Sequence, residues 1–578
     1  MLRTNWAERP IQMIRGRGLL FLLGVVLIFA GGALASLVQS AGGVRVLDIR
    51  FAGATGKSLS ALLYVPPSAS PARKAPAILA VHGYINSREA QSAFAIEFAR
   101  RGYVVLAMDQ TGHGYSAPPA FADGFGGPDG LRYLRGLDIV DVDNIGLEGH
   151  SMGGWAVLKA AEALPDGYKS MLLIGSSTGT AGTKEGTAAF PRNLGLIYSR
   201  YDEFSRLMWG TERAADVARS PKLVKLFGIT AEARIGRLYG DVDAGTARIL
   251  LAPAITHPMD HLSRETVADS IVWFARTLKG GTPFAAYDQV WFWKELGTAM
   301  GLVGLVVLLL GTIDVLLVIP GFAVLDAQPD CAIAARDLRW WTSWGLMVWV
   351  PVLSYFAFLG LGIRYFPAGP VFRQAITNQI LVWAGLNAVV TVVVGLVTRG
   401  QRAEVRLRIV PSLGLALAVA AVGYLAVVLV GHYGTVDLRF WMIAMKPLSR
   451  DQFVLFLTYL PGFTAVFLAI LHMLHTRLSC YSDSAMRQYI ANGAALGLGF
   501  AIFLGAQYGS LPVIGHILTP EHPLDVILAI QFLPLLVAVS IISTFAWRRT
   551  GTPLPGGLLC GILVTWYIVA GQATQLAL

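Results

Sequence analysis

The sequence has little charge and almost no cysteine. Only 14% of its 578 residues are Asp, Glu, Lys or Arg, whereas about a quarter is usual in soluble domains. The three cysteines, Cys331, Cys480 and Cys560, all lie in the second half of the chain at wide spacings. This pattern excludes a disulfide framework and a cysteine-based metal site. The shortage of charge is typical of a chain that is partly embedded in lipid.

Charge is also distributed unevenly. Residues 43–280 have an ordinary content of charged residues, whereas residues 296–578 contain long uncharged runs. We therefore predict a water-soluble domain over 43–280, joined to a membrane domain of about eight helices over 291–578. The net charge of +10 does not indicate a nucleic-acid partner, because the arginines gather at the ends of apolar runs, as they do beside a lipid bilayer.

An apolar run of about 20 residues can cross a bilayer as a helix. The first run, 19–38, follows an arginine-containing segment, 1–18, and we interpret it as an uncleaved anchor, although Ala33-Leu34-Ala35 resembles a signal cleavage site. Lys and Arg are more numerous in the loops on the side of residues 1–18, which predicts a cytoplasmic N-terminus. The chain is thus expected to be a multi-pass cell-membrane protein with residues 43–280 outside the cytoplasm. The further expected spans are 296–320, 341–361, 376–398, 410–431, 453–474, 489–507, 524–546 and 556–575.

Gly149-His150-Ser151-Met152-Gly153 fits the pattern G-x-S-x-G. In this pattern a serine sits on a sharp turn between a strand and a helix, and its hydroxyl is lifted above the edge of a sheet. The residues before it, 144–148, form a strand-like run, and residues 154–161 form a helix-like run. The sequence therefore predicts that Ser151 is a nucleophile.

Short apolar runs alternate with helical patterns throughout residues 43–280. Helices are expected over 87–101 and, with Ser263 as its N-cap, over 263–278. This alternation predicts a mostly parallel sheet with helices on both faces. The expected strands are 44–52, 59–65, 77–81, 102–108, 144–148, 171–174, 194–198 and 247–254.

Three stretches in this order, His82-Gly83-Tyr84, Asp109 to Ser116, and Gly149 to Gly153, resemble the α/β-hydrolase superfamily, in particular its serine aminopeptidase and monoacylglycerol-lipase-like group. The resemblance covers residues 43–280. It implies the α/β-hydrolase fold and a catalytic triad in the chain order serine, acid, histidine. It also implies an oxyanion hole formed by the backbone N–H groups of Tyr84 and Met152.

Two positions of the triad have competing candidates. The expected acid is Asp202, which follows the strand at 194–198, and the alternatives are Asp241 and Asp243. The histidine is either His261 or His257. We favour His261, because a short loop and a helix cap follow it as in the family, and because Pro258 would constrain His257. Residues 203–246 are too long for a simple loop and could form a cap over the site or dock onto the membrane domain.

These observations predict a membrane-bound serine hydrolase, similar to carboxylesterases and lipases, that cleaves an ester through an acyl-enzyme on the extracytoplasmic side. The expected substrate is a small-molecule or lipid-like ester, and no metal or organic cofactor is expected. One alternative is a serine peptidase of the same fold. The other is a transporter or receptor whose hydrolase-like domain does not catalyse. The sequence indicates no oligomeric state.

Overall fold

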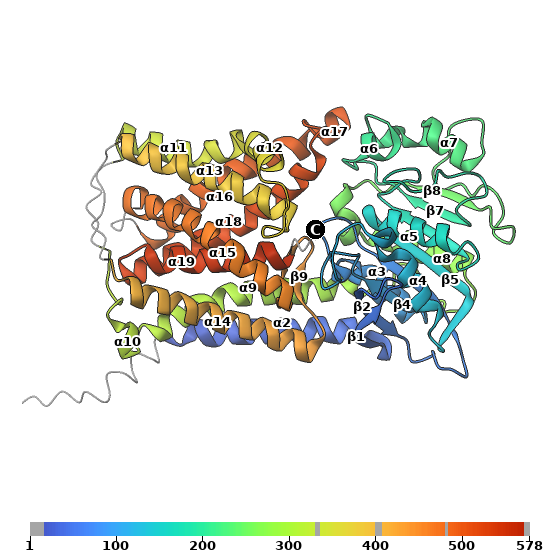
Figure 1. Cartoon of the computed structure of the whole chain (residues 1–578), viewed down its shortest axis with the longest axis horizontal. Helices are drawn as coiled ribbons and strands as arrows, with labels where there is room; N and C mark the ends of the chain where they lie inside the picture. The colour runs from blue at the N-terminus through green and yellow to red at the C-terminus, as the bar shows by residue number, and fades with distance from the viewer. Residues whose placement is uncertain (1–16, 330–335, 399–406, 480–483, 572–578) are drawn as a thin grey trace, which may run out of the picture.

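The computed structural model describes residues 17–329, 336–398, 407–479 and 484–571. Figure 1 shows two parts that lie end to end: a sheet domain, which runs from β1 to α8, and a bundle of long helices. The bundle consists of α2 (Leu19–Gln39) and of α9 to α19, and we call it the helical domain. Most of the expected cytoplasmic segment 1–18, together with Cys331 and Cys480, lies outside the described residues.

An eight-stranded sheet forms the centre of the sheet domain, in the order β1-β2-β4-β3-β5-β6-β7-β8. The pairs β1–β2 and β2–β4 are antiparallel, and every later pair is parallel. Each strand overlaps one of the apolar runs predicted from the sequence. The strands are β1 (Arg45–Ala52), β2 (Ser58–Val65), β3 (Ala75–Val81), β4 (Val104–Met108), β5 (Val140–His150), β6 (Ser170–Ile174), β7 (Leu194–Ile197) and β8 (Arg248–Leu251).

Helices cover both faces of this sheet, because the central strands are apolar on both sides. On β3, Leu79 and Val81 point to the face covered by α4 (Gly127–Arg135) and α5 (Met152–Ala163). Ile78 and Ala80 point to the face covered by α3 (Ser92–Arg100) and α8 (Arg264–Thr277). The predicted cap of α8 is present, since Ser263 Oγ accepts a hydrogen bond from the Thr266 N–H at 3.1 Å. The helix expected over 87–101 is divided into a 3-10 turn, Arg88–Gln91, and α3.

The long segment after Asp202 forms three short helical elements: α6 (Ser205–Trp209), η4 (Ala214–Arg219) and α7 (Pro221–Phe227). Leu226 and Phe227 pack into the apolar core on one face of the sheet. Arg206 in α6 forms an ion pair of 2.9 Å with Glu521 of the helical domain. The segment therefore both covers the sheet domain and contacts the helical domain.

Among the described residues, eight helices are long and apolar enough to cross a membrane, and the number is nine if the bent pair α11 and α12 counts as one span. The bend of 54° falls within the span expected over 341–361. The hairpin formed by β9 and β10 was not predicted. The elements are α9 (Trp291–Leu316), α10 (Pro320–Ala323), α11 (Leu338–Leu353), α12 (Tyr355–Tyr365), α13 (Ala375–Thr398), α14 (Ile409–Gly434), β9 (Leu438–Phe440), β10 (Ile443–Met445), α15 (Arg450–Met473), α16 (Ala485–Gly509), α17 (Leu511–Ile514), α18 (Pro523–Thr550) and α19 (Leu554–Gly571).

The sheet domain is inserted between α2 and α9, which pack against each other along their length (Figure 1). Glycines spaced seven residues apart make this contact possible: Gly24 and Gly31 on α2, and Gly297, Gly304 and Gly311 on α9. A Cβ atom at Gly304 would lie 2.6 Å from the backbone nitrogen of Ile28. Small residues of this kind let membrane helices approach closely. Both ends of the sheet domain are thereby held at one place on the helical domain.

Candidate active site

Ser151 occupies the turn between β5 and α5, in the strand–turn–helix context that its motif requires. Its backbone has φ 54° and ψ −122°, a strained conformation for a residue with a side chain. The Ser151 N–H donates to the Ile174 carbonyl at 2.8 Å, which fixes the turn to the neighbouring strand. A Cβ atom at Gly149 would overlap the backbone of Gly153, and one at Gly153 would overlap the Val81 carbonyl oxygen, so both flanking glycines are needed for the sharp turn.

Asp202 and His257 lie next to each other in the structure. Asp202 follows the carboxyl end of β7, and its Oδ2 lies 2.7 Å from His257 Nδ1. Its other oxygen accepts hydrogen bonds from the Phe204 N–H at 2.8 Å and the Tyr198 hydroxyl at 3.2 Å. The carboxylate is thus fixed through both oxygens, and it orients the imidazole so that Nε2 is the nitrogen left to receive a proton.

His261, the base that the sequence favoured, has a different neighbour. Its Nε2 lies 3.1 Å from His150 Nδ1, and its Nδ1 has no hydrogen-bond partner among the described residues. The structure thus pairs Asp202 with His257 and not with His261. The argument from Pro258 was wrong, because Pro258 lies in the first turn of a 3-10 helix, His257–Leu262, where its fixed φ suits the helix. His257 can therefore precede it without strain.

The alternative acids, Asp241 and Asp243, are not brought to the site. Both are exposed and lie in the turn before β8, where Asp241 Oδ1 accepts the Ala244 N–H at 2.7 Å. Ser151 follows the carboxyl end of β5, and β5 to β8 run parallel. A residue before β8 therefore lies at the opposite edge of the sheet.

Tyr84 and Met152, whose backbone N–H groups are expected to form the oxyanion hole, belong to segments that lie beside Ser151. Met152 is the first residue of α5, where N–H groups have no partner within the helix and carry partial positive charge. The chain before Tyr84 passes beside the serine, since a Cβ atom at Gly83 would lie 3.0 Å from Ser151 Cβ. Ile85, the next residue, has φ 55°, which is rare for a β-branched residue. It packs into the apolar core of the helical domain.

A cavity of about 50 Å³ lies over these residues, and both domains line it. The sheet domain contributes Tyr84, Ser151, Phe204, His257 and His261 among others. The helical domain contributes Trp441, Met442, Leu524 and Ile527. Sequence reasoning missed these four residues. One signal could have indicated them: Asp437, Arg439 and Lys446 are charged residues gathered in an otherwise apolar half of the chain.

The hairpin of β9 and β10 carries the helical domain into this cavity. At its tip, Trp441 has φ 53°, and its indole Nε1 donates to the Pro258 carbonyl at 2.6 Å. On β9, Arg439 Nη2 donates to Ser87 Oγ at 3.1 Å, and directly after β10, Lys446 Nζ lies 3.1 Å from Glu89 Oε2. The hairpin is therefore anchored to the sheet domain and directly supports the segment that holds His257.

The electrostatic surroundings separate the two candidate histidines. Burial alone would lower the pKa of His257, but the charge and hydrogen bond of Asp202, helped by Asp260 and Glu203, raise it to about 9. Burial lowers the pKa of His261 well below its ordinary value, and the charges of His150 and His257 lower it further. Burial and the charge of Asp202 raise the pKa of Glu203 to about 7. Of the two candidate histidines, His257 is therefore the one that combines a basic imidazole with an orienting carboxylate.

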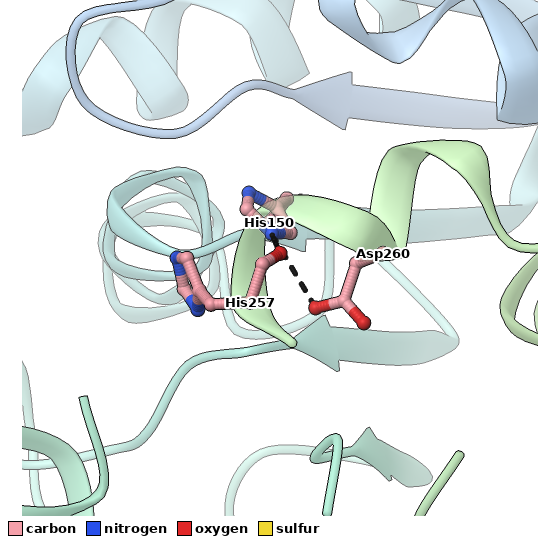
Figure 2. Close-up of side chains that lie close together, drawn as sticks. All are labelled: His150, His257 and Asp260. Carbon is pink, nitrogen blue, oxygen red and sulfur yellow. Dashed lines mark hydrogen bonds and ion pairs between the residues drawn. The ribbon is translucent and has the colours of Figure 1, made fainter. Parts of the chain in front are cut away.

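His150, His257 and Asp260 form a group that could hold a metal ion, with ligand atoms within 4.8 Å of one another (Figure 2). His150 Nε2 lies 3.5 Å from Asp260 Oδ2, and the other oxygen of Asp260 accepts a hydrogen bond from Ser199 Oγ at 2.5 Å. His257 Nδ1 is already engaged by Asp202. A metal ion here would therefore have to use His257 Nε2, the same nitrogen that an acyl-transfer reaction needs.

A family model described as "alpha/beta hydrolase fold" matches residues 76–205. This match covers β3 to the start of α6 and includes both Ser151 and Asp202. The sheet domain has the α/β-hydrolase fold. The fold class predicted from the sequence, an α/β hydrolase together with a set of long apolar helices, is confirmed, and the match supports a hydrolase.

Curated relatives are similar over part of the chain only. Dipeptidyl peptidase 8 of Homo sapiens is 32% identical over 127 residues, which cover 19% of this chain and 14% of the relative. An uncharacterized protein of Mycobacterium tuberculosis is 24% identical over 211 residues, which cover 35% of this chain and 52% of the relative. Less than two thirds of either relative is therefore covered.

Among solved structures, an esterase from Pyrococcus furiosus is 17% identical, with a TM-score of 0.29, and the similarity covers 41% of this chain and 93% of the esterase. A hypothetical protein from Pseudomonas aeruginosa is also 17% identical, with a TM-score of 0.30, and the similarity covers 42% of this chain and 95% of that protein. No substrate follows from similarity at this level.

Proposed function

We propose that this protein is a membrane-bound serine hydrolase that cleaves an ester through Ser151, His257 and Asp202. The observation that carries the proposal is the 2.7 Å contact between Asp202 Oδ2 and His257 Nδ1, on a histidine that lines the same cavity as Ser151. Serine is a weak nucleophile until a base removes its proton, and the base needs a carboxylate to hold its tautomer. In this arrangement His257 is the base and Asp202 is the carboxylate that orients it.

In the proposed reaction, Ser151 Oγ attacks the ester carbonyl carbon while His257 Nε2 takes the hydroxyl proton. The N–H groups of Tyr84 and Met152 stabilise the oxyanion of the tetrahedral intermediate. The ester C–O bond then breaks, and the leaving alcohol takes the proton from His257. Water, activated by the same histidine, hydrolyses the acyl-enzyme, releases the acid and regenerates Ser151.

We further propose that the helical domain spans the cell membrane, with the N-terminus in the cytoplasm and the sheet domain outside it. The eight apolar helices support the spanning, and the distribution of Lys and Arg in the sequence supports the orientation. The active-site cavity lies at the junction of the two domains, since residues from both line it. The site would therefore face the outer surface of the bilayer, where lipid-like esters are available.

A serine peptidase is the second candidate, favoured by the local similarity to dipeptidyl peptidase 8. Recognition of a peptide's amino terminus would call for a carboxylate that faces the substrate. The cavity lining contains no Asp or Glu side chain among the described residues, and it is mostly apolar apart from Ser151, Asn86, Tyr84, Trp441 and the histidines. The lining thus favours an ester over a peptide substrate.

The test is labelling by a membrane-impermeant fluorophosphonate probe on intact cells. Wild type should be labelled, Ser151→Ala should not, and Ser58→Ala, a change at an exposed serine of the same domain, should be labelled like wild type. Labelling only after lysis would contradict the proposed orientation. An absence of labelling in both conditions would contradict the hydrolase and favour a transporter or receptor with a non-catalytic domain.

A further inference from the structure

A second cavity, of about 240 Å³, lies within the helical domain between α9, α18 and α19. Its lining carries no charged side chain. The hydroxyl of Tyr567 is used in a hydrogen bond to Gln531 Oε1. Along α18 the cavity extends from Pro534 to Ile542, which is about 12 Å at the rise of a helix. The lining residues are Leu302, Val303, Leu305, Val306, Leu309, Ile443, Met445, Pro534, Leu535, Ala538, Val539, Ile542, Cys560, Leu563, Val564 and Tyr567.

Two structural elements connect this cavity to the one over Ser151. On α18, Ile527 lines the active-site cavity, and Pro534, Ala538 and Ile542 line the apolar cavity. Their spacing places them on one face of the helix, with Gln531 between Ile527 and Pro534 on the same face. Ile527 and Pro534 are separated by about 10 Å along the helix axis.

The β9–β10 hairpin makes the same connection. Trp441 and Met442, at its tip, line the active-site cavity, whereas Ile443 and Met445, on β10, line the apolar cavity. The two cavities thus share a wall made of one hairpin and one helix face. A long substrate whose reactive group lies at the Ser151 end of this shared wall would have the rest of its length beside the apolar cavity.

We propose that the apolar cavity binds the acyl chain of the ester substrate while its carbonyl carbon lies at Ser151. This inference rests on the proposed function and names its substrate class: an ester of a long-chain fatty acid. A charged headgroup does not fit a cavity without charges or free polar groups, because its desolvation would be uncompensated. A hydrocarbon chain fits it, and a chain that enters from the bilayer leaves one apolar environment for another.

The test compares p-nitrophenyl butyrate, octanoate and dodecanoate as substrates. The full-length protein is placed in nanodiscs of a dialkyl-ether phosphatidylcholine, which has no carboxylic ester bond for the protein to cleave. In wild type, kcat/KM should rise with chain length by up to about fourfold for each methylene that becomes buried. Ala538→Trp fills the cavity and should lower the ratio of dodecanoate to butyrate kcat/KM at least tenfold. Ala538→Leu should stop the rise at an intermediate chain length.

The matched control is Ala421→Trp, the same change at an exposed position of α14, which should keep the wild-type ratio. Equal labelling of Ser151 by a small fluorophosphonate shows that each variant is folded.

An unchanged ratio of dodecanoate to butyrate kcat/KM in both Ala538 variants would overturn the proposal. If the Ala538 variants lose kcat/KM equally with all three esters, the proposal is also overturned, because the cavity would then hold a resident bilayer lipid and not the acyl chain of the substrate. If wild type hydrolyses the butyrate ester but shows no preference for longer chains, the proposed acyl site is wrong while the proposed hydrolase activity is supported. If Ser151 is not labelled, the hydrolase itself fails.

Discussion

His257 and His261 are four residues apart in the same 3-10 segment and line the same cavity, yet only His257 contacts a carboxylate. We therefore expect His257→Gln to lower kcat at least about 10³-fold, as removal of a triad base does. His261→Gln, the matched control, should lower kcat less than tenfold. Hydrolysis of a p-nitrophenyl ester by the purified variants measures both effects. If His261→Gln lowered kcat more than His257→Gln did, His261 would be the base.

The pH dependence of hydrolysis should follow the protonation of His257. A general base must be neutral to accept a proton, and the pKa of His257 is raised to about 9 by Asp202 despite its burial. In wild type, kcat/KM should therefore increase with pH and reach half its maximum near pH 9. Asp202→Asn removes the charge that raises the pKa, so the midpoint should move to lower pH while the maximum falls. A midpoint that is the same in both proteins would contradict the pairing of Asp202 with His257.

At the scale of residues, the sequence was sufficient where a local pattern determines the geometry. Ser151 could be placed on its turn because glycine is needed on both sides of it, and Ser263 could be placed as a cap because the helix pattern starts directly after it. The choice between His257 and His261 could not be made, because spacing does not show which imidazole meets a carboxylate located 55 residues earlier. The argument that favoured His261 also misjudged Pro258, which lies in the first turn of a 3-10 helix and does not constrain His257.

At the scale of elements, the β9–β10 hairpin links the helical domain to the catalytic segment through the hydrogen bond from Trp441 Nε1 to the Pro258 carbonyl. Trp441→Phe keeps most of the aromatic ring but removes the donor, and an unsatisfied buried carbonyl costs about 1–3 kcal/mol. We expect kcat/KM to fall about tenfold, equivalent to about 1.4 kcal/mol, because His257 is less well positioned.

The matched control for this hairpin variant is Trp349→Phe, at an exposed position of α11, which should behave like wild type. Steady-state kinetics with the same ester measure both variants. The alkaline midpoint should stay near that of wild type in Trp441→Phe, because Asp202 still contacts His257. A shifted midpoint with an unchanged maximal rate would mean that Trp441 acts on the charge of His257 and not on its position.

Strands and long helices could be predicted because each is an apolar run whose length suits its type. The hairpin could not, because its two strands have three residues each, too few to show a period. The bend between α11 and α12 was missed for a related reason. Hydropathy averaged over 341–361 reports that the segment is apolar, but it does not report that the chain turns by 54° at Ser354.

At the scale of the whole molecule, a buried ion pair joins the two domains. Lys446 Nζ lies 3.1 Å from Glu89 Oε2, and both side chains are at least nine-tenths buried. Burial alone would raise the pKa of Glu89, but Lys446 and Arg88 hold it well below its ordinary value. Lys446→Met would leave the Glu89 carboxylate without this partner, which should destabilise the assembled protein by about 3–5 kcal/mol.

The measurement for the ion pair is thermal unfolding in nanodiscs, with Glu89→Gln and the double variant Glu89→Gln/Lys446→Met to complete a cycle. The double variant should be more stable than Lys446→Met alone, because it removes a buried charge that has lost one of its partners. If the effects of the two single changes simply add, the two residues do not interact across the domain junction. The same proteins should lose Ser151 labelling in parallel with unfolding, since the cavity needs both domains.

The sequence predicted that the chain has two parts, because their charge contents differ sharply, and the structure has a sheet domain and a helical domain. It did not predict how they meet. The active-site cavity is lined by both Ser151 and Ile527, and a cavity shared by residues so far apart in the chain leaves no local pattern in a single sequence. The seven-residue spacing of glycines on α2 and α9 is visible in the sequence, but the spacing alone does not show that these two helices pack against each other.

The insertion of the sheet domain between α2 and α9 has a consequence for biosynthesis. The proposed triad is complete once the chain has been made to His257, but Ile527, which lines the cavity, follows the last sheet-domain helix by about 250 residues. At ~5–20 residues per second, translation of that stretch takes roughly 10 to 50 seconds. During this interval the proposed nucleophile, Ser151, would lie beside an incomplete cavity. On the proposed function, the protein would be made as a latent hydrolase, and assembly of its last helices would activate it.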